Sequence, residues 1–346
     1  MIYLQRREKA GYKMSDQVML FVFGLILLIK GGDWFVGGAG AIARRLHLPE
    51  ILIGATVVSI GTTLPEVMVS ATSAVQGIGG IAYGNAIGSV ICNTALVAAV
   101  TVAVRPSSVD RNSLILPIGF FFLSAIFYAF NAYVFGKFTR GSGIVLLAIF
   151  LFYMVVTVLQ MKKNPVPESE ITARDLQEEI EKSDEGEVRQ SLLKSLIYLA
   201  VGAALIAIGA DLLVDNGTKI AKALGVPETV IALTFVALGT SLPELVTAVT
   251  SLAKGHSALS LGNVIGANLF NLVLVTGVSA TIAPFAVPAD KSLNGINASL
   301  IIDIPVMFGV MLLLAVPVLL RGKLYKPQGI ALLIVYAGFC LMQFLI

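Results

Sequence analysis

Two glutamates that end near-identical segments are the residues of this sequence best suited to chemistry. Glu66 ends GTTLPE and Glu244 ends GTSLPE, and both segments lie inside long apolar stretches. Hydroxyl residues stand four and three positions before each glutamate, so on a helix they share its face. They are Thr62 and Thr63 in the first segment and Thr240 and Ser241 in the second. Carboxylate and hydroxyl oxygens are ligands for hard cations such as Ca²⁺, so each segment predicts half of a cation site.

A proline stands immediately before each glutamate. Pro65 and Pro243 carry no amide hydrogen, so in a helix the carbonyl four residues back loses its partner and its oxygen becomes free for a cation. The same distortion should expose the carbonyls of Ser59 and Ala237. Each segment therefore offers carboxylate, hydroxyl and backbone oxygens within about two helical turns.

Amide oxygens follow in the next apolar stretch of each half. Asn93 and Asn271 end the matched sequences GNAIGSVICN and GNVIGANLFN. No His or Cys cluster accompanies them, and the all-oxygen set suits Ca²⁺, which takes about six to eight oxygen ligands. Two carboxylates balance one divalent cation or share their charge among several monovalent cations. Competition for the same oxygens would then be the simplest route to ion exchange.

The apolar stretches are the elements that must position these residues. The chain has 346 residues, of which 57% are hydrophobic and 13% charged, and its mean hydropathy is +0.89. Runs of about twenty apolar residues, enough to cross a hydrocarbon core of roughly 30 Å as a helix, recur throughout. The sequence predicts an all-α integral membrane protein with ten transmembrane helices. Their expected ranges are 17–43, 50–76, 79–104, 113–135, 143–161, 192–222, 228–253, 258–283, 299–320 and 327–346.

Glu66 and Glu244 are the acidic residues placed most nearly at the middle of a predicted span. A carboxylate at that depth costs several kcal/mol, and such residues usually face a cavity with a function. A single glutamate could be a protonated structural residue. Two at matched positions, each with a proline and hydroxyls, favour the ion site.

One charged stretch divides the predicted spans into two sets of five. We expect an N-terminal tail at 1–16, a first half at 17–161, a charged connector at 162–191 and a second half at 192–346. The composition of the connector is typical of a solvated segment without a packed core.

The two halves repeat one another. Residues 31–97, shifted by 178 positions, fall on 209–275 without a gap, and 26 of the 67 pairs are identical. The fold is therefore a duplicated membrane unit. Because each unit holds an odd number of spans, the second must enter the membrane from the opposite side, as in the inverted-topology repeats of secondary transporters.

The distribution of Lys and Arg predicts the orientation. With the N-terminus outside, the inward loops hold 14 of these residues and the outward loops hold five. We therefore expect a multi-pass protein of the cell membrane, with its N-terminus outside and the connector in the cytoplasm. Four basic residues before Met14 would lie outside in this orientation, contrary to the rule. We therefore hypothesise that the native chain starts at Met14.

The sequences GTTLPEVMVSATS and GTSLPELVTAVTS, each followed by a GN-x-x-G-x-x-x-x-N segment, resemble the two alpha repeats of the sodium/calcium exchanger branch of the calcium/cation antiporter superfamily, prokaryotic type. The resemblance implies exchange of several Na⁺ for one Ca²⁺ by alternating access, with the first and sixth spans sliding across a more rigid core. Ca²⁺ and Na⁺ would be transported substrates in a lipid bilayer, with no cofactor and no required protein partner. A net charge of +3 gives no reason to expect nucleic acid.

The resemblance also implies a role for each residue of the site. Glu66 and Glu244 would be the central calcium carboxylates, and the carbonyls of Thr62 and Thr240 would complete the calcium site. Asn93 would lie beside the centre. The flanking sodium sites would take oxygens from Thr63, Ser241, Ser59, Ala237 and Ser89.

Two positions depart from the family pattern. Asn271 stands where these exchangers often carry an aspartate, and Ala267 stands where a serine is expected. The loss of a carboxylate and a hydroxyl leaves an alternative open, an H⁺/Ca²⁺ antiporter whose same two glutamates are protonated when calcium leaves. A channel would not require inverted halves around one site. We expect no enzyme, because the sequence holds no nucleophile with a base, no HExxH segment and no phosphate loop.

Overall fold

The computed structural model describes residues 2–45, 48, 50–106, 109–163, 192–223, 241–289, 292–293 and 295–345. Within these ranges, eight helices are long and apolar enough to cross a membrane. The predicted seventh span, 228–253, is described only from Ser241 onward, and the tenth corresponds to a 20-residue helix at the C-terminal end. The chain is an all-α membrane protein. The predicted connector lies outside the described residues beyond Lys163.

Five predicted spans of the first half are each a helix or a run of joined helices. α1 extends to Ile2, so the predicted tail at 1–16 is helical from that residue onward. The elements of this half are α1 (Ile2–Arg45), α2 (Glu50–Ile53), the π-helical turn η1 (Gly54–Val58), α3 (Ser59–Val75), α4 (Gly79–Cys92), the π-helical turn η2 (Asn93–Ala98), α5 (Ala99–Val104), α6 (Arg111–Phe130), the π-helical turn η3 (Asn131–Phe135) and α7 (Arg140–Lys163).

The second half has a similar succession of helices, except that its last π-helical turn precedes α15, whereas η3 follows α6. Those described are α9 (Leu192–Ala223), α12 (Leu242–Ala253), α13 (Ser257–Phe270), the π-helical turn η5 (Asn271–Val275), α14 (Thr276–Ile282), the π-helical turn η6 (Ser299–Asp303), α15 (Ile304–Arg321) and α16 (Lys326–Leu345). Apart from the start of α1, the described helix boundaries agree with the predicted ranges to within a few residues, because long apolar runs end clearly at polar loops.

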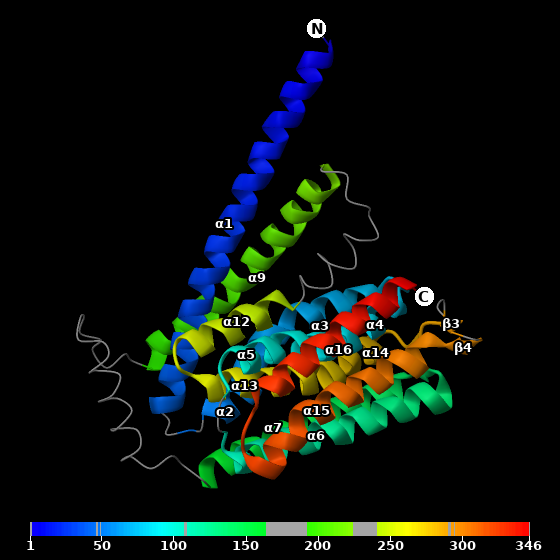
Figure 1. Cartoon of the computed structure of the whole chain (residues 1–346). Coiled ribbons are helices and arrows are strands. Elements are labelled where there is room, and N and C mark those ends of the chain that lie inside the picture. Colours follow the sequence, from blue (N-terminus) through cyan, green and yellow to red (C-terminus); the bar gives the residue numbers. More distant parts are fainter. Residues whose placement is uncertain are drawn as a thin grey trace.

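α1 and α9 lie side by side, inclined to the other helices, and run in opposite directions (Figure 1). Glycines bring their backbones together. A Cβ on Gly31 would lie 2.9 Å from the carbonyl oxygen of Gly202, and one on Gly209 would lie 2.8 Å from that of Gly24. The shift of 178 carries Gly31 onto Gly209 and Gly24 onto Gly202, so exchanging the repeats exchanges the two contacts. This two-fold relation is what an inverted duplication predicts.

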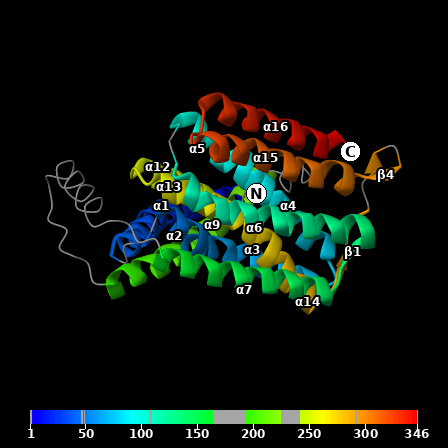
Figure 2. The ribbon, with the colours of Figure 1, turned by 90° about the horizontal axis from the view of Figure 1, so that it is seen from below.

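α13 lies in the middle of the remaining helices, with α7 on one side and α16 on the other (Figure 2). Within an 18-residue apolar window of the span Ser257–Ile282, 89% of the residues are buried, whereas the share in the corresponding window of Arg140–Met161 is 28%. The helix that carries the GN motif of the second repeat is therefore interior. α7 presents apolar side chains outward, as a lipid-facing helix does.

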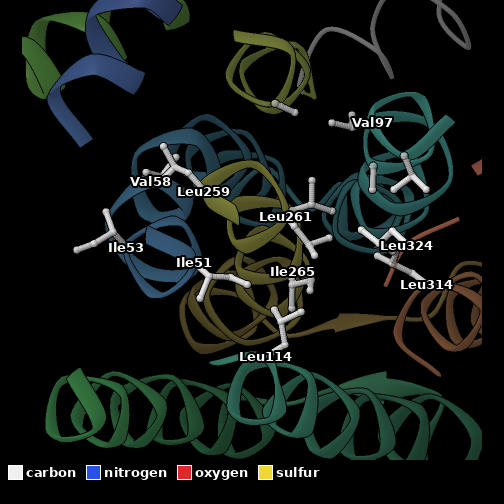
Figure 3. Packing of buried hydrophobic residues seen from close by; sticks show 14 of the residues in the cluster. Ile51, Ile53, Val58, Val97, Leu114, Leu259, Leu261, Ile265, Leu314 and Leu324 are labelled. Atoms are coloured by element: carbon white, nitrogen blue, oxygen red, sulfur yellow. The ribbon is translucent and has the colours of Figure 1, made fainter. Parts of the chain in front are cut away.

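An apolar cluster joins the two repeats around α13. Leu114 of α6 points toward Ile265 of α13, with Ile51 of α2 nearby (Figure 3). Glycines again permit the approach: a Cβ on Gly54 would lie 2.8 Å from the backbone nitrogen of Asn263. α13 therefore packs backbone against backbone on α2 and η1, which leaves no room for side chains between them.

Two short antiparallel strand pairs lie outside the helices. β1 (Lys137–Phe138) pairs with β2 (Phe285–Ala286), and β3 (Ser292–Leu293) pairs with β4 (Ile296–Asn297). The first pair links the loop before α7 to the segment after α14, so it ties the two halves together at one end of the bundle.

Candidate ion-binding site

Glu66 of α3 and Glu244 of α12 lie close enough for their charges to interact, and both side chains are fully buried. Among the described residues, no group forms a hydrogen bond of ordinary geometry with either carboxylate. Leaving a buried charge uncompensated costs several kcal/mol. The negative charge of the two carboxylates must therefore be compensated, either by a bound cation or by a proton.

Further polar side chains near the carboxylates are buried without a hydrogen-bond partner in the described part of the chain. They are Thr63, Asn93, Ser241 and Asn271. Buried polar groups in proteins are normally hydrogen-bonded, so a cluster of unpartnered ones needs an explanation. A bound cation would explain the unpartnered oxygens, because oxygen atoms that accept no hydrogen bond are available to coordinate a cation.

Asn93 and Asn271 occupy matched positions in matched helix distortions. Asn93 begins η2 and Asn271 begins η5, 178 residues later in the sequence. α3 packs on η5 and α12 packs on η2, so each distorted turn contacts the glutamate helix of the other repeat. Single π-helical turns inside α-helices occur frequently at functional sites. The site is thus assembled across the repeats.

The two prolines lie at different places in their helices. Pro65 lies inside α3, where it leaves the Gly61 carbonyl without its helical donor. Pro243 lies in the first turn of α12, whose N-cap is Ser241. A helix start leaves that N–H unbonded in any case, so Pro243 removes no bond within α12. The carbonyl expected to be freed by Pro243, that of Gly239, lies outside the described residues.

Thr62 and Ser59 direct their hydroxyls toward α13. Thr62 Oγ1 donates to Asn263 Oδ1 at 3.3 Å and lies beside the Glu244 carboxylate. Ser59 Oγ donates to the Gly54 carbonyl at 2.7 Å and is 2.9 Å from the Asn263 carbonyl. Both residues are buried, and they place hydroxyl oxygens of the first repeat against the motif helix of the second.

Two of the predicted ligands, Ala237 and Thr240, lie outside the described residues. Every other predicted site residue is buried. These residues are Ser59, Thr62, Thr63, Glu66, Ser89, Asn93, Ser241, Glu244 and Asn271.

Two asparagines that the motif spacing does not identify as ligands also border the site. Asn85 Nδ2 donates to the backbone carbonyl of Glu66 at 3.3 Å and to Ser70 Oγ at 2.8 Å, and Asn85 Oδ1 accepts from Ser89 Oγ at 3.5 Å. Asn263, its counterpart, accepts from both hydroxyls described above. Asn85 and Asn263 are the asparagines of the two Gly-Asn pairs. Their identity at matched positions of the two repeats is the sequence feature from which they could have been predicted.

Two buried carboxylates among neutral oxygens, placed where inverted repeats meet inside a bundle of membrane-spanning helices, define a secondary transporter of cations. The family model described as sodium/calcium exchanger protein matches residues 17–159 and 194–345. The chain belongs to this family. It is therefore a multi-pass membrane protein of the cation/Ca²⁺ exchange type, that is, a member of a transporter family.

Similarity to individual proteins extends over almost the whole chain. The putative antiporter CaxA of Alkalimonas amylolytica is 34% identical over 96% of this chain and 99% of its own. The sodium/calcium exchanger MaX1 of Methanosarcina acetivorans is 30% identical over 95% of this chain and 98% of its own. A solved structure of the sodium-calcium exchanger NCX_Mj, soaked with Na⁺ and Sr²⁺, is 33% identical and has a TM-score of 0.76, covering 94% of this chain and 97% of that one.

Proposed function

We propose that this protein exchanges Na⁺ for Ca²⁺ across the membrane by exposing one site alternately to either side. The observation that carries the proposal is the pair of carboxylates, Glu66 and Glu244, buried together with no balancing positive charge and no hydrogen bond of ordinary geometry from the described residues. The relatives named as sodium/calcium exchangers support sodium as the second ion.

The proposed ligands are the oxygens that the two repeats bring together. Glu66 and Glu244 supply carboxylates to Ca²⁺, and the carbonyls of Thr62 and Thr240 complete its shell. The oxygens proposed for Na⁺ come from Ser59, Thr63, Ser89, Ala237 and Ser241. Asn93 and Asn271 border the centre from η2 and η5.

Charge balance explains why such a site would exchange ions and not leak them. One Ca²⁺ neutralises both carboxylates, and several Na⁺ can do the same. Either load removes the cost of buried uncompensated charge, so the loaded site can pass between its two facing states. Without a load, the two charges oppose that passage. Transport in one direction is thereby coupled to transport in the other.

The same proposal includes the surroundings of the site. The halves at 17–161 and 192–346 form the two inverted units, the segment 162–191 lies in the cytoplasm, and the N-terminus lies outside, as the Lys and Arg counts indicate. Ca²⁺ and Na⁺ are substrates, and the proposal needs no cofactor and no protein partner.

Uptake of ⁴⁵Ca²⁺ into vesicles that contain the purified protein tests the proposal. An outward Na⁺ gradient should drive uptake, and Glu66→Gln and Glu244→Gln should each abolish it. Asp215→Asn is the matched control, because this carboxylate is exposed and pairs with Lys219 of the same helix. Uptake that follows only a proton gradient would establish the H⁺/Ca²⁺ alternative instead. Full uptake by the doubly substituted protein would refute the site.

A further inference from the structure

Asn263 is held rigidly between the repeats. Its side chain is fully buried in α13. The glycines beside it, Gly262 and Gly266, bring α13 against the backbone of Ile51 and Ala55, where any Cβ would overlap backbone atoms. The Asn263 amide therefore cannot move away from η1 and the start of α3 without a shift of a whole helix.

The Asn263 side chain accepts a hydrogen bond from Thr62 and lies within hydrogen-bond distance of Ser59, whose shorter contacts are to the backbone carbonyls of Gly54 and Asn263. Ser59 Oγ and Thr62 Oγ1 each lie 3.3 Å from Asn263 Oδ1. A hydroxyl has one proton and two lone pairs. When the proton points at Asn263, or at the nearby backbone carbonyls, only lone pairs remain for the site. The hydroxyls then act as acceptors toward a cation and cannot donate to the glutamates.

The matched residue of the first repeat bonds differently. Asn85 donates to Ser70 Oγ, but the position that corresponds to Ser70 in the second repeat is Ala248. Asn263 therefore lacks this partner within its own repeat, and its Nδ2 has no hydrogen-bond partner among the described residues. Likewise, the counterpart of Ser59 is Ala237, so the second repeat offers no such hydroxyl. The contact of a serine hydroxyl with the GN asparagine therefore has no counterpart in the second repeat's glutamate segment.

We propose that Asn263 is a positioning residue that sets the preference of the site for monovalent over divalent ions, by holding the hydroxyls of Ser59 and Thr62 as cation acceptors. The inference rests on the proposed Na⁺/Ca²⁺ exchange. A single Ca²⁺ can take ligands from both carboxylates at once. Several Na⁺ must share those carboxylates, so they depend more on neutral oxygens such as these hydroxyls.

The test is equilibrium binding of ⁴⁵Ca²⁺ to the purified full chain, with Na⁺ as competitor. Asn263→Leu keeps the shape of the side chain but removes the acceptor. It should raise the Na⁺ concentration that displaces half of the bound Ca²⁺ about tenfold, while the Ca²⁺ dissociation constant changes less than about threefold. Equal weakening of both ions, or of neither, overturns the inference.

Two further variants separate positioning from a loss of folding. Ser59→Ala removes one of the positioned hydroxyls, so it should weaken Na⁺ competition selectively, and its effect should not add to that of Asn263→Leu. If Asn263→Leu does not fold, unchanged Na⁺ competition in Ser59→Ala overturns the inference by itself. Asn131→Leu is the matched control, because this asparagine is also buried but its side-chain hydrogen bond within the described part of the chain goes to the Phe127 carbonyl, one turn earlier in the same span.

The unaltered chain distinguishes the two proposals. If Na⁺ does not displace Ca²⁺ from it, sodium exchange is refuted and the role of Asn263 with it. If Na⁺ displaces Ca²⁺ from the unaltered chain and from Asn263→Leu equally, only the role of Asn263 is refuted.

Discussion

Lys254, at the end of α12, reaches across to Asp33 of α1: its Nζ donates to the Asp33 backbone carbonyl at 2.8 Å and lies 3.6 Å from Asp33 Oδ1. The shift of 178 carries Asp33 onto Asp211 but carries Gln76 onto Lys254. The corresponding contact between α9 and the end of α3 therefore cannot be an ion pair. The duplicated fold holds a charged link on one side only.

We expect Lys254→Gln to shift the population ratio of the two facing states measurably, while it lowers the free energy of unfolding only slightly. Both side chains are more than one-third exposed, so the pair should contribute at most about 1 kcal/mol to unfolding. The same energy, applied to one facing state only, shifts their ratio up to about fivefold. The ratio of Ca²⁺ affinities measured from the two sides of oriented vesicles reports this shift. Lys219→Gln is the control, since its pair with Asp215 stays within α9; an unchanged ratio in Lys254→Gln would contradict the expectation.

Gly202→Ala should destabilise the contact between α1 and α9. The added Cβ would lie 2.5 Å from the backbone nitrogen of Phe35 and 2.8 Å from the Gly31 carbonyl oxygen, and neither backbone atom can turn aside. Overpacking of this kind costs about 1–3 kcal/mol. Gly309→Ala in α15 is the control, because a Cβ there meets no described atom within 4 Å. Thermal unfolding in detergent should show a lower midpoint for Gly202→Ala alone, and equal midpoints would argue against close backbone packing.

Tyr153→Phe should weaken both stability and Ca²⁺ binding. The Tyr153 hydroxyl donates to the Ala55 carbonyl of η1 at 2.9 Å, and η1 leads directly into Ser59. The loss of this buried bond should cost about 1 kcal/mol of unfolding free energy. Because η1 sets the position of the α3 oxygens, the Ca²⁺ dissociation constant should rise by about two- to fivefold.

Tyr133→Phe provides the comparison for that variant. Tyr133 also donates to a backbone carbonyl, but it lies in η3 and its acceptor is Leu300 of η6, not a residue of η1. It should leave the Ca²⁺ dissociation constant unchanged. If both variants weaken Ca²⁺ binding alike, the hydroxyl of Tyr153 has no specific link to the site.

Asn271→Asp should change how the rate of Na⁺-driven Ca²⁺ uptake depends on the Na⁺ concentration. Both amide atoms of Asn271 are buried without a partner among the described residues, so a carboxylate there would face the same region as Glu66. A third negative charge calls for a further monovalent cation when Ca²⁺ is absent. Na⁺-driven uptake should then rise more steeply with Na⁺ concentration. Asn93→Asp, at the matched position, should act in the same direction, and identical Na⁺ curves for all three proteins would place Asn271 outside the site.

Much of the fold could be predicted because its signals are local. A helix that crosses lipid needs a long apolar run, and each such run can be read without knowledge of its neighbours. For the same reason the GTTLPE and GTSLPE segments could be assigned an all-oxygen chemistry before any contact was known. The helical start of α1 at Ile2 was missed, because the polar residues before Met14 do not resemble a membrane span.

The roles of the two GN asparagines could not be predicted in this way. Asn85 and Asn263 stand at matched positions in matched segments, yet Asn85 bonds within its own repeat and Asn263 bonds across to Ser59 and Thr62. Hydrogen bonds between residues so far apart in the sequence depend on which helix packs against the asparagine. That is decided by the packing of α13 on η1, about two hundred residues away in sequence.

The sequence by itself determined the membrane class, the duplication with its inversion and the two carboxylates with their hydroxyls, because hydrophobic run length, side-chain period and charge are properties of each segment alone. Only the tertiary structure decided that η2 and η5 each contact the glutamate helix of the opposite repeat, and that Lys254 reaches Asp33. These relationships join residues far apart in the chain. Their physical cause is the close backbone packing that glycines permit between the two halves.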